Sequence, residues 1–213
     1  MLKSLQKAFK VKEVRDRLLY TFMMLVVIRI GCCLPIPGVD PSYLHDFFSN
    51  LQSSGMGFFN AITGGSFSSM SIFALSITPY ITSSIIMQLL TIAIPKLEEM
   101  QKDGEDGRKK IAEYTRYLTV GLALFESCAM AVGLGGKGLL LEDHRNVWGY
   151  LTVVAAMTAG SALLMWIGER ITDNGVGNGI SIVLTINIIS RVPSDLALLY
   201  ENFIKGKTIA KGT

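Results

Sequence analysis

Charged side chains are scarce in this sequence of 213 residues, which has 20 Lys and Arg, 17 Asp and Glu, and a net charge of only +3. Nucleic-acid-binding proteins neutralise many phosphates with Lys and Arg, so we expect no direct nucleic-acid site. The two histidines, His45 and His144, lie far apart in loop-like contexts. They leave no cluster of metal ligands, and we expect neither a metal nor a cofactor.

Disulfide and catalytic patterns are lacking too. The three cysteines, Cys32, Cys33 and Cys128, all lie in apolar segments, where small core side chains are the better interpretation. There is no HExxH motif, and the GGSFS sequence of residues 64–68 does not match GxSxG. No histidine is placed to activate a Ser or Cys within an apolar segment. We therefore do not expect an enzyme.

Apolar residues make up half of the chain. They form blocks of about 18–21 residues, the length that crosses a bilayer as a helix. The sequence predicts an integral membrane protein of the all-α class, a polytopic helical bundle. Its five predicted spans cover residues 18–35, 72–94, 114–135, 147–167 and 180–199.

Residues 55–94 are too long and too varied for one crossing. As a single helix, residues 58–94 would reach roughly 55 Å, whereas the hydrocarbon core of a bilayer is ~30 Å thick. Residues 58–71 mix aromatic residues with Gly and Ser, whereas residues 72–94 are almost wholly apolar. We predict a short re-entrant helix over 57–71, a break, and then a span. Irregular backbone at membrane depth persists only when it is buried in protein or lines a wet cavity, which suggests a pore.

The segments outside the spans predict the topology. Residues 1–17 form a basic amphipathic helix on the membrane surface, or alternatively a solvated tail. Together with the loops 95–113 and 168–179, residues 1–17 hold most of the Lys and Arg of the chain. Because basic residues favour the cytosolic side of a membrane, all three segments are predicted to be cytosolic. Residues 200–213 then begin an external loop, within which the sequence stops.

Two single residues and one loop need separate interpretation. Arg29 interrupts the apolar run 18–35, which favours a span over a secretion signal. Its side chain either snorkels to the far interface or pairs inside the bundle. Glu126 lies within a span, and it either faces a polar seam between helices or has a structural role. The glycine-rich loop before residue 180 is expected to end in a helix cap at Asn178.

Isoleucine and leucine recur at helical spacing in two places. Ile77, Ile81 and Ile85 fall four residues apart, and Ile180, Leu184 and Ile188 repeat that spacing. In most membrane helices such residues pack or face lipid. Beside a polar re-entrant segment, however, apolar rings can narrow a pore and gate it by dewetting.

Three long motifs closely resemble the SecY family, the central subunit of the bacterial protein-conducting channel. They are SIFALSITPYITSSIIMQLLTIAIP (71–95), KDGEDGRKKIAEYTRYLT (102–119) and LMWIGERITDNGVGNGISI (164–182). The resemblance runs in one collinear order over essentially the whole chain. It implies a channel of ten spans in two inverted halves, of which this chain is similar to the first half, spans one to five.

The resemblance implies roles for individual residues. The pore ring would include Ile77, Ile81, Ile180 and Leu184, the last at a position where isoleucine is commoner. The second and third spans would form one side of a lateral gate, and its residues would include Thr82, Ile85 and Glu126, with Glu126 where an uncharged polar residue is expected. The plug, a short helix that closes the external funnel, would include Phe58, Phe59, Asn60, Ile62, Gly64, Gly65, Phe67 and Met70.

The mechanism implied by the resemblance is passive conduction of an unfolded secretory chain, with lateral release of membrane segments into lipid. The implied location is the cell (plasma or inner) membrane, with the amino terminus cytosolic. The implied partners are the SecE and SecG subunits, the SecA motor ATPase, the ribosome, the translocating polypeptide with its signal sequence, and membrane lipid. Two other classes stay open from the residues alone. One is half of a secondary transporter with a discontinuous helix, and the other is a membrane scaffold subunit.

Overall fold

The computed structural model describes residues 11–39, 62–134, 140–141, 146–193, 196–197 and 200. Its helices are α2 (Lys12–Cys32), α5 (Thr78–Ala93), α6 (Pro95–Lys102), α7 (Glu105–Leu134), α8 (Val147–Asn174) and α9 (Gly179–Ile189). The described residues contain no strand, and two isolated bridges pair Pro35 with Ser71 and Val39 with Leu140. The predicted all-α class is confirmed.

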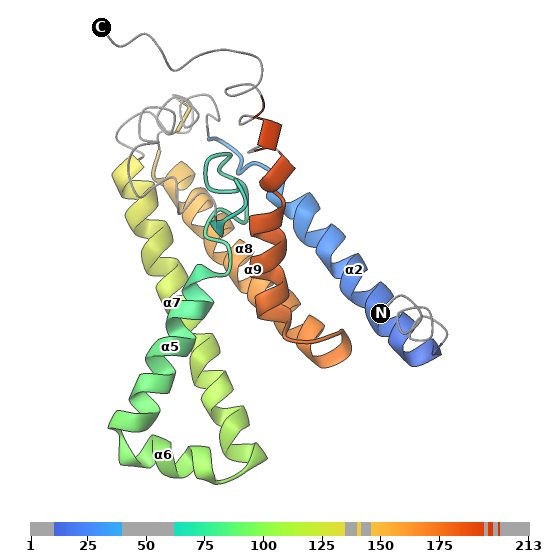
Figure 1. Ribbon diagram of the computed structural model, residues 1–213. Helices are drawn as coiled ribbons and strands as arrows, with labels where there is room; N and C mark the ends of the chain where they lie inside the picture. Colours follow the sequence, from blue (N-terminus) through green and yellow to red (C-terminus); the bar gives the residue numbers. More distant parts are fainter. Residues whose placement is uncertain are drawn as a thin grey trace, which may run out of the picture.

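Helix α8 is the centre of the bundle. It packs against α7 on one side and against α9 and α2 on the other, and α5 packs on α7 (Figure 1). The short helix α6 joins α5 to α7 at the lower end of the view. The segment 62–77, which is non-helical from residue 63 on, lies inside the bundle in front of α8, directly before α5.

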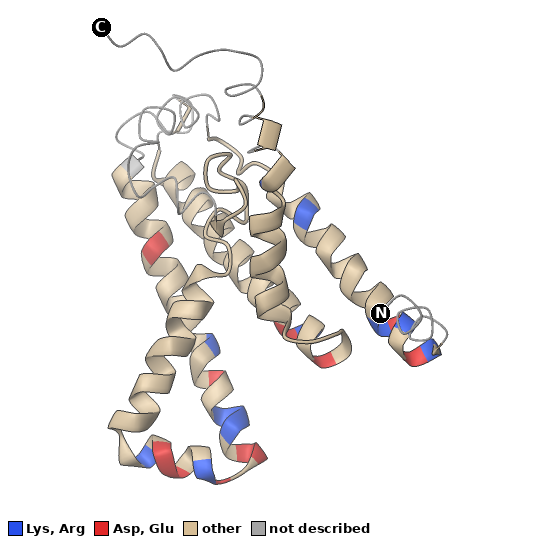
Figure 2. Cartoon of the chain, in the orientation of Figure 1, with Lys and Arg blue, Asp and Glu red and all other residues tan. Residues whose placement is uncertain are grey.

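Charged residues gather at one end of this bundle. Figure 2 shows them where α2 begins, along α6, at the start of α7 and at the end of α8, while the rest of the helices carry few. The structure thus places the three segments predicted to be cytosolic, as far as they are described, at a common end. Many large apolar side chains on the outer faces of the helices are exposed, such as Phe22, Phe125 and Trp148. That distribution is what a hydrocarbon environment requires.

Five of the six helices follow the five predicted spans in order. By length and composition only α8 qualifies on its own as a membrane crossing among the described helices. Helices α5 and α6 qualify together, but the chain bends by 102° between them. Helix α9 has 11 residues, which is roughly 16 Å of helix against a core of ~30 Å. It therefore needs protein around it if it lies at membrane depth.

The structure corrects the prediction of a loop over residues 95–113, because this segment is almost entirely helical. Pro95 begins α6 at a position where its missing N–H matters little, and Gly104 (φ +80°) makes the turn into α7. Along α6, Lys102 Nζ donates to Glu98 Oε1 at 2.6 Å, a pair four residues apart. This hydrogen bond lowers the pKa of the Glu98 carboxyl group. The dense charges therefore support helices instead of a hairpin loop.

A second correction concerns the segment 62–77. In place of the regular helix expected over 57–71, residues 63–70 form successive turns, while 57–61 lie outside the described residues. Gly64, Gly65 and Met70 have φ of +66°, +84° and +41°, which a right-handed helix cannot accommodate. Turns continue through residues 72–77, so the predicted span 72–94 is helical only from Thr78.

The ends of α8 and α9 also differ from the predicted ranges. Helix α8 continues past residue 167 to Asn174, so the predicted loop 168–179 is helical over its first half. Helix α9 ends at Ile189, ten residues before the predicted limit of 199, although residues 192–193, 196–197 and 200 are again helical. The predicted cap is confirmed, because Asn178 Oδ1 accepts from the N–H groups of Ile180 at 3.1 Å and Ser181 at 3.4 Å.

The core is organised around the non-helical segment. One cluster includes Phe67 and Met70 with residues of α7 and α8, and the other includes Phe73 and Ile77 with residues of α2, α8 and α9. Two backbone hydrogen bonds fix the segment beside the end of α2, from Ile36 N to Met70 O and from Ile72 N to Leu34 O, each 3.0 Å long. The irregular chain is therefore the centre of the packing.

Gly160 of α8 tests this packing. A Cβ atom there would lie 2.0 Å from the backbone oxygen of Ile72, which cannot move without displacing the segment. We expect Gly160→Ala to lower the free energy of unfolding by about 1–3 kcal/mol, as overpacking does. Gly121→Ala in α7 is the control. Apart from its chain neighbours and the backbone of its own helix, no atom lies within 4 Å of its Cβ position, so the change to alanine should gain roughly 0.5–1 kcal/mol of helix stability. Denaturant unfolding of the purified protein measures both, and equal effects would contradict this packing.

Candidate functional site

A groove of about 370 Å³ lies between α5 and the start of α9. Its walls come from two short helical faces. The residues that line it are Tyr80, Ile81, Ser84, Ile85 and Gln88 from α5, with Asn178, Ile180, Ser181 and Leu184 from α9 and its cap. Three of the four predicted pore-ring residues therefore meet in one groove, together with Ile85 of the predicted lateral gate.

Ile77, the fourth predicted pore-ring residue, lies beneath the groove. Its side chain is 1% exposed and belongs to the core cluster of α2, α8 and α9, whereas Ile81, Ile180 and Leu184 are half-buried. Ile77 and Ile180 still converge on one point, because a Cβ atom at Gly168 would lie 3.5 Å from Ile77 Cδ1 and 3.6 Å from Ile180 Cδ1. Ile77 thus supports the apolar face of the groove from below.

Glycine brings α8 and α9 together beneath this face. A Cβ atom at Gly179 would lie 1.9 Å from the backbone oxygen of Gly168, so only glycine fits at the start of α9. Thr172 adds a polar contact at the same place, since its Oγ1 accepts from the N–H of Gly179 at 2.9 Å. The position of Ile180 and Leu184 in the groove therefore depends on a backbone contact between two helices.

Polar side chains of the groove were not among the predicted site residues. Tyr80, Ser84 and Gln88 follow one another at intervals of four, next to Ile81 and Ile85 on the same face of α5. Gln88 Nε2 donates to Ser84 Oγ at 3.4 Å. These polar residues have the same four-residue spacing as the isoleucines, so the sequence pattern could have identified them as well. The groove is thus part apolar and part polar, and none of its nine lining residues carries a formal charge.

The other predicted gate residues lie outside the groove. Thr82 is exposed on α5, and Glu126 is half-buried on α7. The two helices pack against each other. Near Glu126, Ser127 Oγ and Thr158 Oγ1 lie 3.0 Å apart and connect α7 to α8. Towards the charged end, Arg116 Nε donates to Glu169 Oε1 at 2.8 Å, a second polar link between these helices.

The predicted plug residues divide into three groups. Phe58, Phe59 and Asn60 lie outside the described residues. Phe67 and Met70 are buried, at 5% and 1% exposed, in the core cluster shared with α7 and α8. Ile62, Gly64 and Gly65 are half-buried at the beginning of the described part of the segment.

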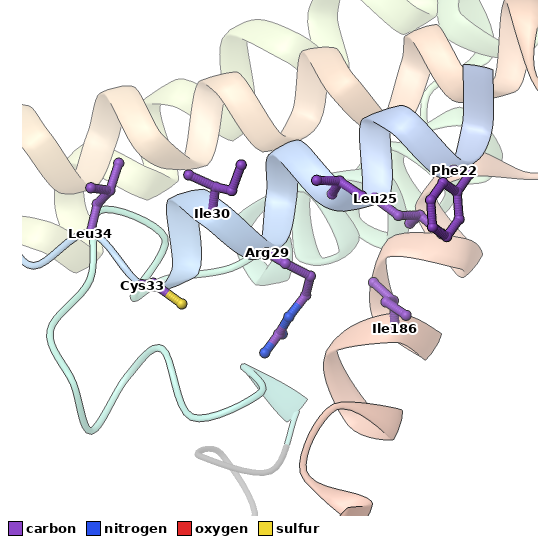
Figure 3. Close-up of a pocket in the computed structure, with 8 residues that line it drawn as sticks. Phe22, Leu25, Arg29, Ile30, Cys33, Leu34 and Ile186 are labelled. Atoms are coloured by element: carbon purple, nitrogen blue, oxygen red, sulfur yellow. The ribbon is translucent and has the colours of Figure 1, made fainter. Parts of the chain in front are cut away.

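A second groove, of about 500 Å³, lies beside α2 (Figure 3). Its walls are apolar apart from Arg29, whose side chain extends from α2 towards α9 and the segment that follows residue 62 (Figure 3). Arg29 Nη1 is buried and has no hydrogen-bond partner among the described residues. Of the two expectations for Arg29, pairing inside the bundle is therefore not seen within the described part of the chain.

Known proteins with a similar sequence form one family. A family model described as SecY matches residues 71–211. The protein translocase subunit SecY of Pseudomonas aeruginosa is 42% identical over 194 residues, which cover 91% of this chain and 43% of that protein. The subunit of Escherichia coli K12 is 42% identical over 198 residues, 91% of this chain and 44% of the relative. The subunit of Streptomyces scabiei is 44% identical over 212 residues, which cover 94% of this chain and 48% of that protein. The chain spans less than half the length of these relatives.

Two solved structures with a similar fold are described as channels. One is described as Sec61 in the canine ribosome-channel complex from the endoplasmic reticulum, and another as the structure of a protein conducting channel. Each has a TM-score of 0.58 and 19% sequence identity, and the match covers 89% of this chain and 38% of the other. At that identity the likeness shows the fold alone. From the sequence matches, this chain belongs to the SecY family.

Proposed function

We propose that this chain forms the amino-terminal half of a SecY-type protein-conducting channel, which acts by conduction and not by catalysis. The observation that carries the proposal is the groove in which Ile81, Ile180 and Leu184 meet above a buried, non-helical segment. The chain covers less than half of its relatives, so the facing wall of the conduit belongs to the second half of the protein.

The composition of the groove suits the passage of an unfolded polypeptide. Uncharged polar groups such as Ser84 and Gln88 can exchange hydrogen bonds with a moving backbone without holding it. The apolar side chains form a narrow belt in which water, and therefore ions, are unfavourable. With a polypeptide in place, the same side chains close around it. Conduction and sealing thus come from one surface.

Residues 57–71 supply the plug in this proposal, although their described part, 62–71, forms turns in place of a regular helix. The plug would move away from the conduit when a chain enters, and residues 72–77 would connect it to α5. Helices α5 and α7 form one side of the lateral gate, with Thr82 and Ile85 on α5 and Glu126 on α7. A signal sequence or a membrane segment would leave to lipid along this side.

The location and partners in this proposal are those that the resemblance to the SecY family implies. The protein lies in the cell membrane with the amino terminus in the cytosol, which agrees with the charged end of the bundle in Figure 2. Energy for transport comes from the SecA motor or a translating ribosome, and SecE and SecG complete the channel. The canine structural neighbour is itself described as a ribosome-channel complex, which supports the ribosome as a partner.

The rival function is half of a secondary transporter. Ion-coupled transporters place ionisable groups at the substrate site near the membrane midplane. None of the nine residues lining the groove between α5 and α9 is ionised at neutral pH. Glu126, the acidic residue of the predicted third span, lies on α7 outside that groove. The chemistry of the groove therefore favours conduction.

A photo-crosslinker at Ile81 tests the conduit directly. In the assembled full-length complex, a secretory chain stalled during transport should crosslink to position 81, because that side chain faces the groove. A crosslinker at Leu151 is the control. Leu151 is 57% exposed on α8 and does not line the groove, and it should give no product. If position 81 also gave none, the channel assignment would fall.

A polar side chain in the apolar belt should weaken the seal. We expect Ile81→Asn and Ile180→Asn to raise ion leakage of reconstituted channels several-fold, because an amide favours water in the constriction. Both should also relax selectivity for the signal sequence. Leu89→Asn on α5 is the matched control, since Leu89 is 61% exposed and does not line the groove. Leakage and selectivity that stay unchanged at 81 and 180 would count against the pore-ring role.

A further inference from the structure

Ser76 lies at the junction between the non-helical segment and α5, and it is held in an unusual backbone conformation. Its φ is +54°, a left-handed value that serine adopts rarely. The residue is 1% exposed, and its N–H donates to the backbone oxygen of Phe73 at 2.8 Å. Strain of this kind persists only where the surroundings fix the backbone. The neighbours of Ser76 should therefore show what fixes it.

Two helices supply those neighbours. Asn187 of α9 donates from Nδ2 to Ser76 Oγ at 3.0 Å, and Ser161 of α8 donates from Oγ to the backbone oxygen of Ser76 at 3.4 Å. Both partners are 1% exposed. These residues are distant in sequence from Ser76, so the contacts fasten the segment to α8 and α9.

Asn187 also touches the other end of the segment. A Cβ atom at Gly64 would lie 2.8 Å from the backbone oxygen of Asn187 and 3.1 Å from Ser190 Oγ. Gly64 has φ +66°, so both the approach and the conformation favour glycine. One turn of α9 therefore contacts the segment near its described beginning and at its end.

The amide of Asn187 is only half satisfied. Its Oδ1 is buried and has no hydrogen-bond partner among the described residues. A buried acceptor without a donor destabilises the arrangement that contains it. The strained φ of Ser76 acts in the same direction. When the segment withdraws, water can reach Asn187 Oδ1 and the backbone of Ser76 can relax, so both penalties end. The hydrogen bonds to Ser76 are lost at the same time.

From these opposing effects we infer that Ser76, Ser161 and Asn187 form a latch at the base of the plug, where the connection 72–77 reaches α5, and that this latch holds segment 62–77 in its closed position. Asn187 is the positioning residue of the latch and needs no contact with the transported chain. Favourable hydrogen bonds hold the segment, while backbone strain and an unpaired acceptor keep its release accessible, as a two-state element requires. The inference rests on the proposed function, in which residues 62–71 of this segment belong to the plug and residues 72–77 connect it to α5.

Hydrogen–deuterium exchange of the full-length protein in its membrane complex tests the latch without any transported chain. We expect Ser76→Ala, which removes the acceptor for Asn187, to speed amide exchange across residues 66–77 roughly three- to tenfold, the effect of losing one buried hydrogen bond. Thr185→Ala is the matched control. Thr185 is exposed on the same helix, and within the described part of the chain its hydroxyl bonds only to Ser181 of that helix, so exchange of the segment should not change.

A swap of the two partners separates a latch from a general loss of structure. Asparagine tolerates positive φ, so Ser76→Asn combined with Asn187→Ser can rebuild the pair with the roles exchanged. We expect this double variant to return exchange of residues 66–77 towards the original rate. Exchange of α8 over residues 157–165 should be unchanged in all variants. If Ser76→Ala speeds exchange of α8 as much as exchange of residues 66–77, the measurement is repeated with Ser76→Gly, which relieves the φ strain.

The outcomes distinguish the latch from the channel assignment. Three results would overturn the latch. The first is unchanged amide exchange in Ser76→Ala, and the second is a swap variant that does not restore the original exchange rate. The third is equal loosening of α8 and of the segment in both Ser76→Ala and Ser76→Gly. None of these results touches the crosslink expected at Ile81. Faster exchange confined to the segment, in a protein that gives no crosslink at Ile81, would support the latch and reject the channel.

Discussion

The structure depends on keeping a non-helical backbone buried among membrane helices. Lipid offers no hydrogen bonds, so the polar groups of segment 62–77 must be satisfied by the surrounding protein. The bundle does this with the backbone pairs of Ile36 and Ile72 at the end of α2, and with Asn187 and Ser161 at Ser76. The same segment supplies Phe67, Met70, Phe73 and Ile77 to the two core clusters. Its burial therefore fixes the arrangement of all the neighbouring helices.

Close backbone contacts carry this arrangement to the groove. Gly160 admits the backbone of Ile72 to α8, and Gly179 brings the start of α9 onto Gly168. Small residues at helix contacts are typical of membrane bundles, where packing replaces the hydrophobic effect between helices. Because α9 is held by its amino-terminal end, Ile180 and Leu184 have defined positions opposite α5. The conduit wall thus follows from contacts that lie beneath it.

Sequence reasoning predicted the helices and their order well, since hydropathy and spacing are local signals. It also predicted the Asn178 cap, and the resemblance to the SecY family placed Ile81, Ile180 and Leu184 on one site. It did not predict the turns of 62–77, because positive φ at Met70 and Ser76 depends on tertiary contacts. The helical form of 95–113 was missed because its charges suggested a solvated hairpin. Neither the burial of Ile77 nor the Asn187 contact has a local sequence signal.

The central claim is that one face of α5 borders water within the membrane while another face borders lipid. Single cysteines at Ser84, Gln88 and Leu89, in the full-length complex with Cys32, Cys33 and Cys128 replaced, test it most directly. A membrane-impermeant thiol reagent should modify positions 84 and 88, which line the groove, and leave position 89 unmodified. Equal modification at the three positions, or none at 84 and 88, would contradict the account.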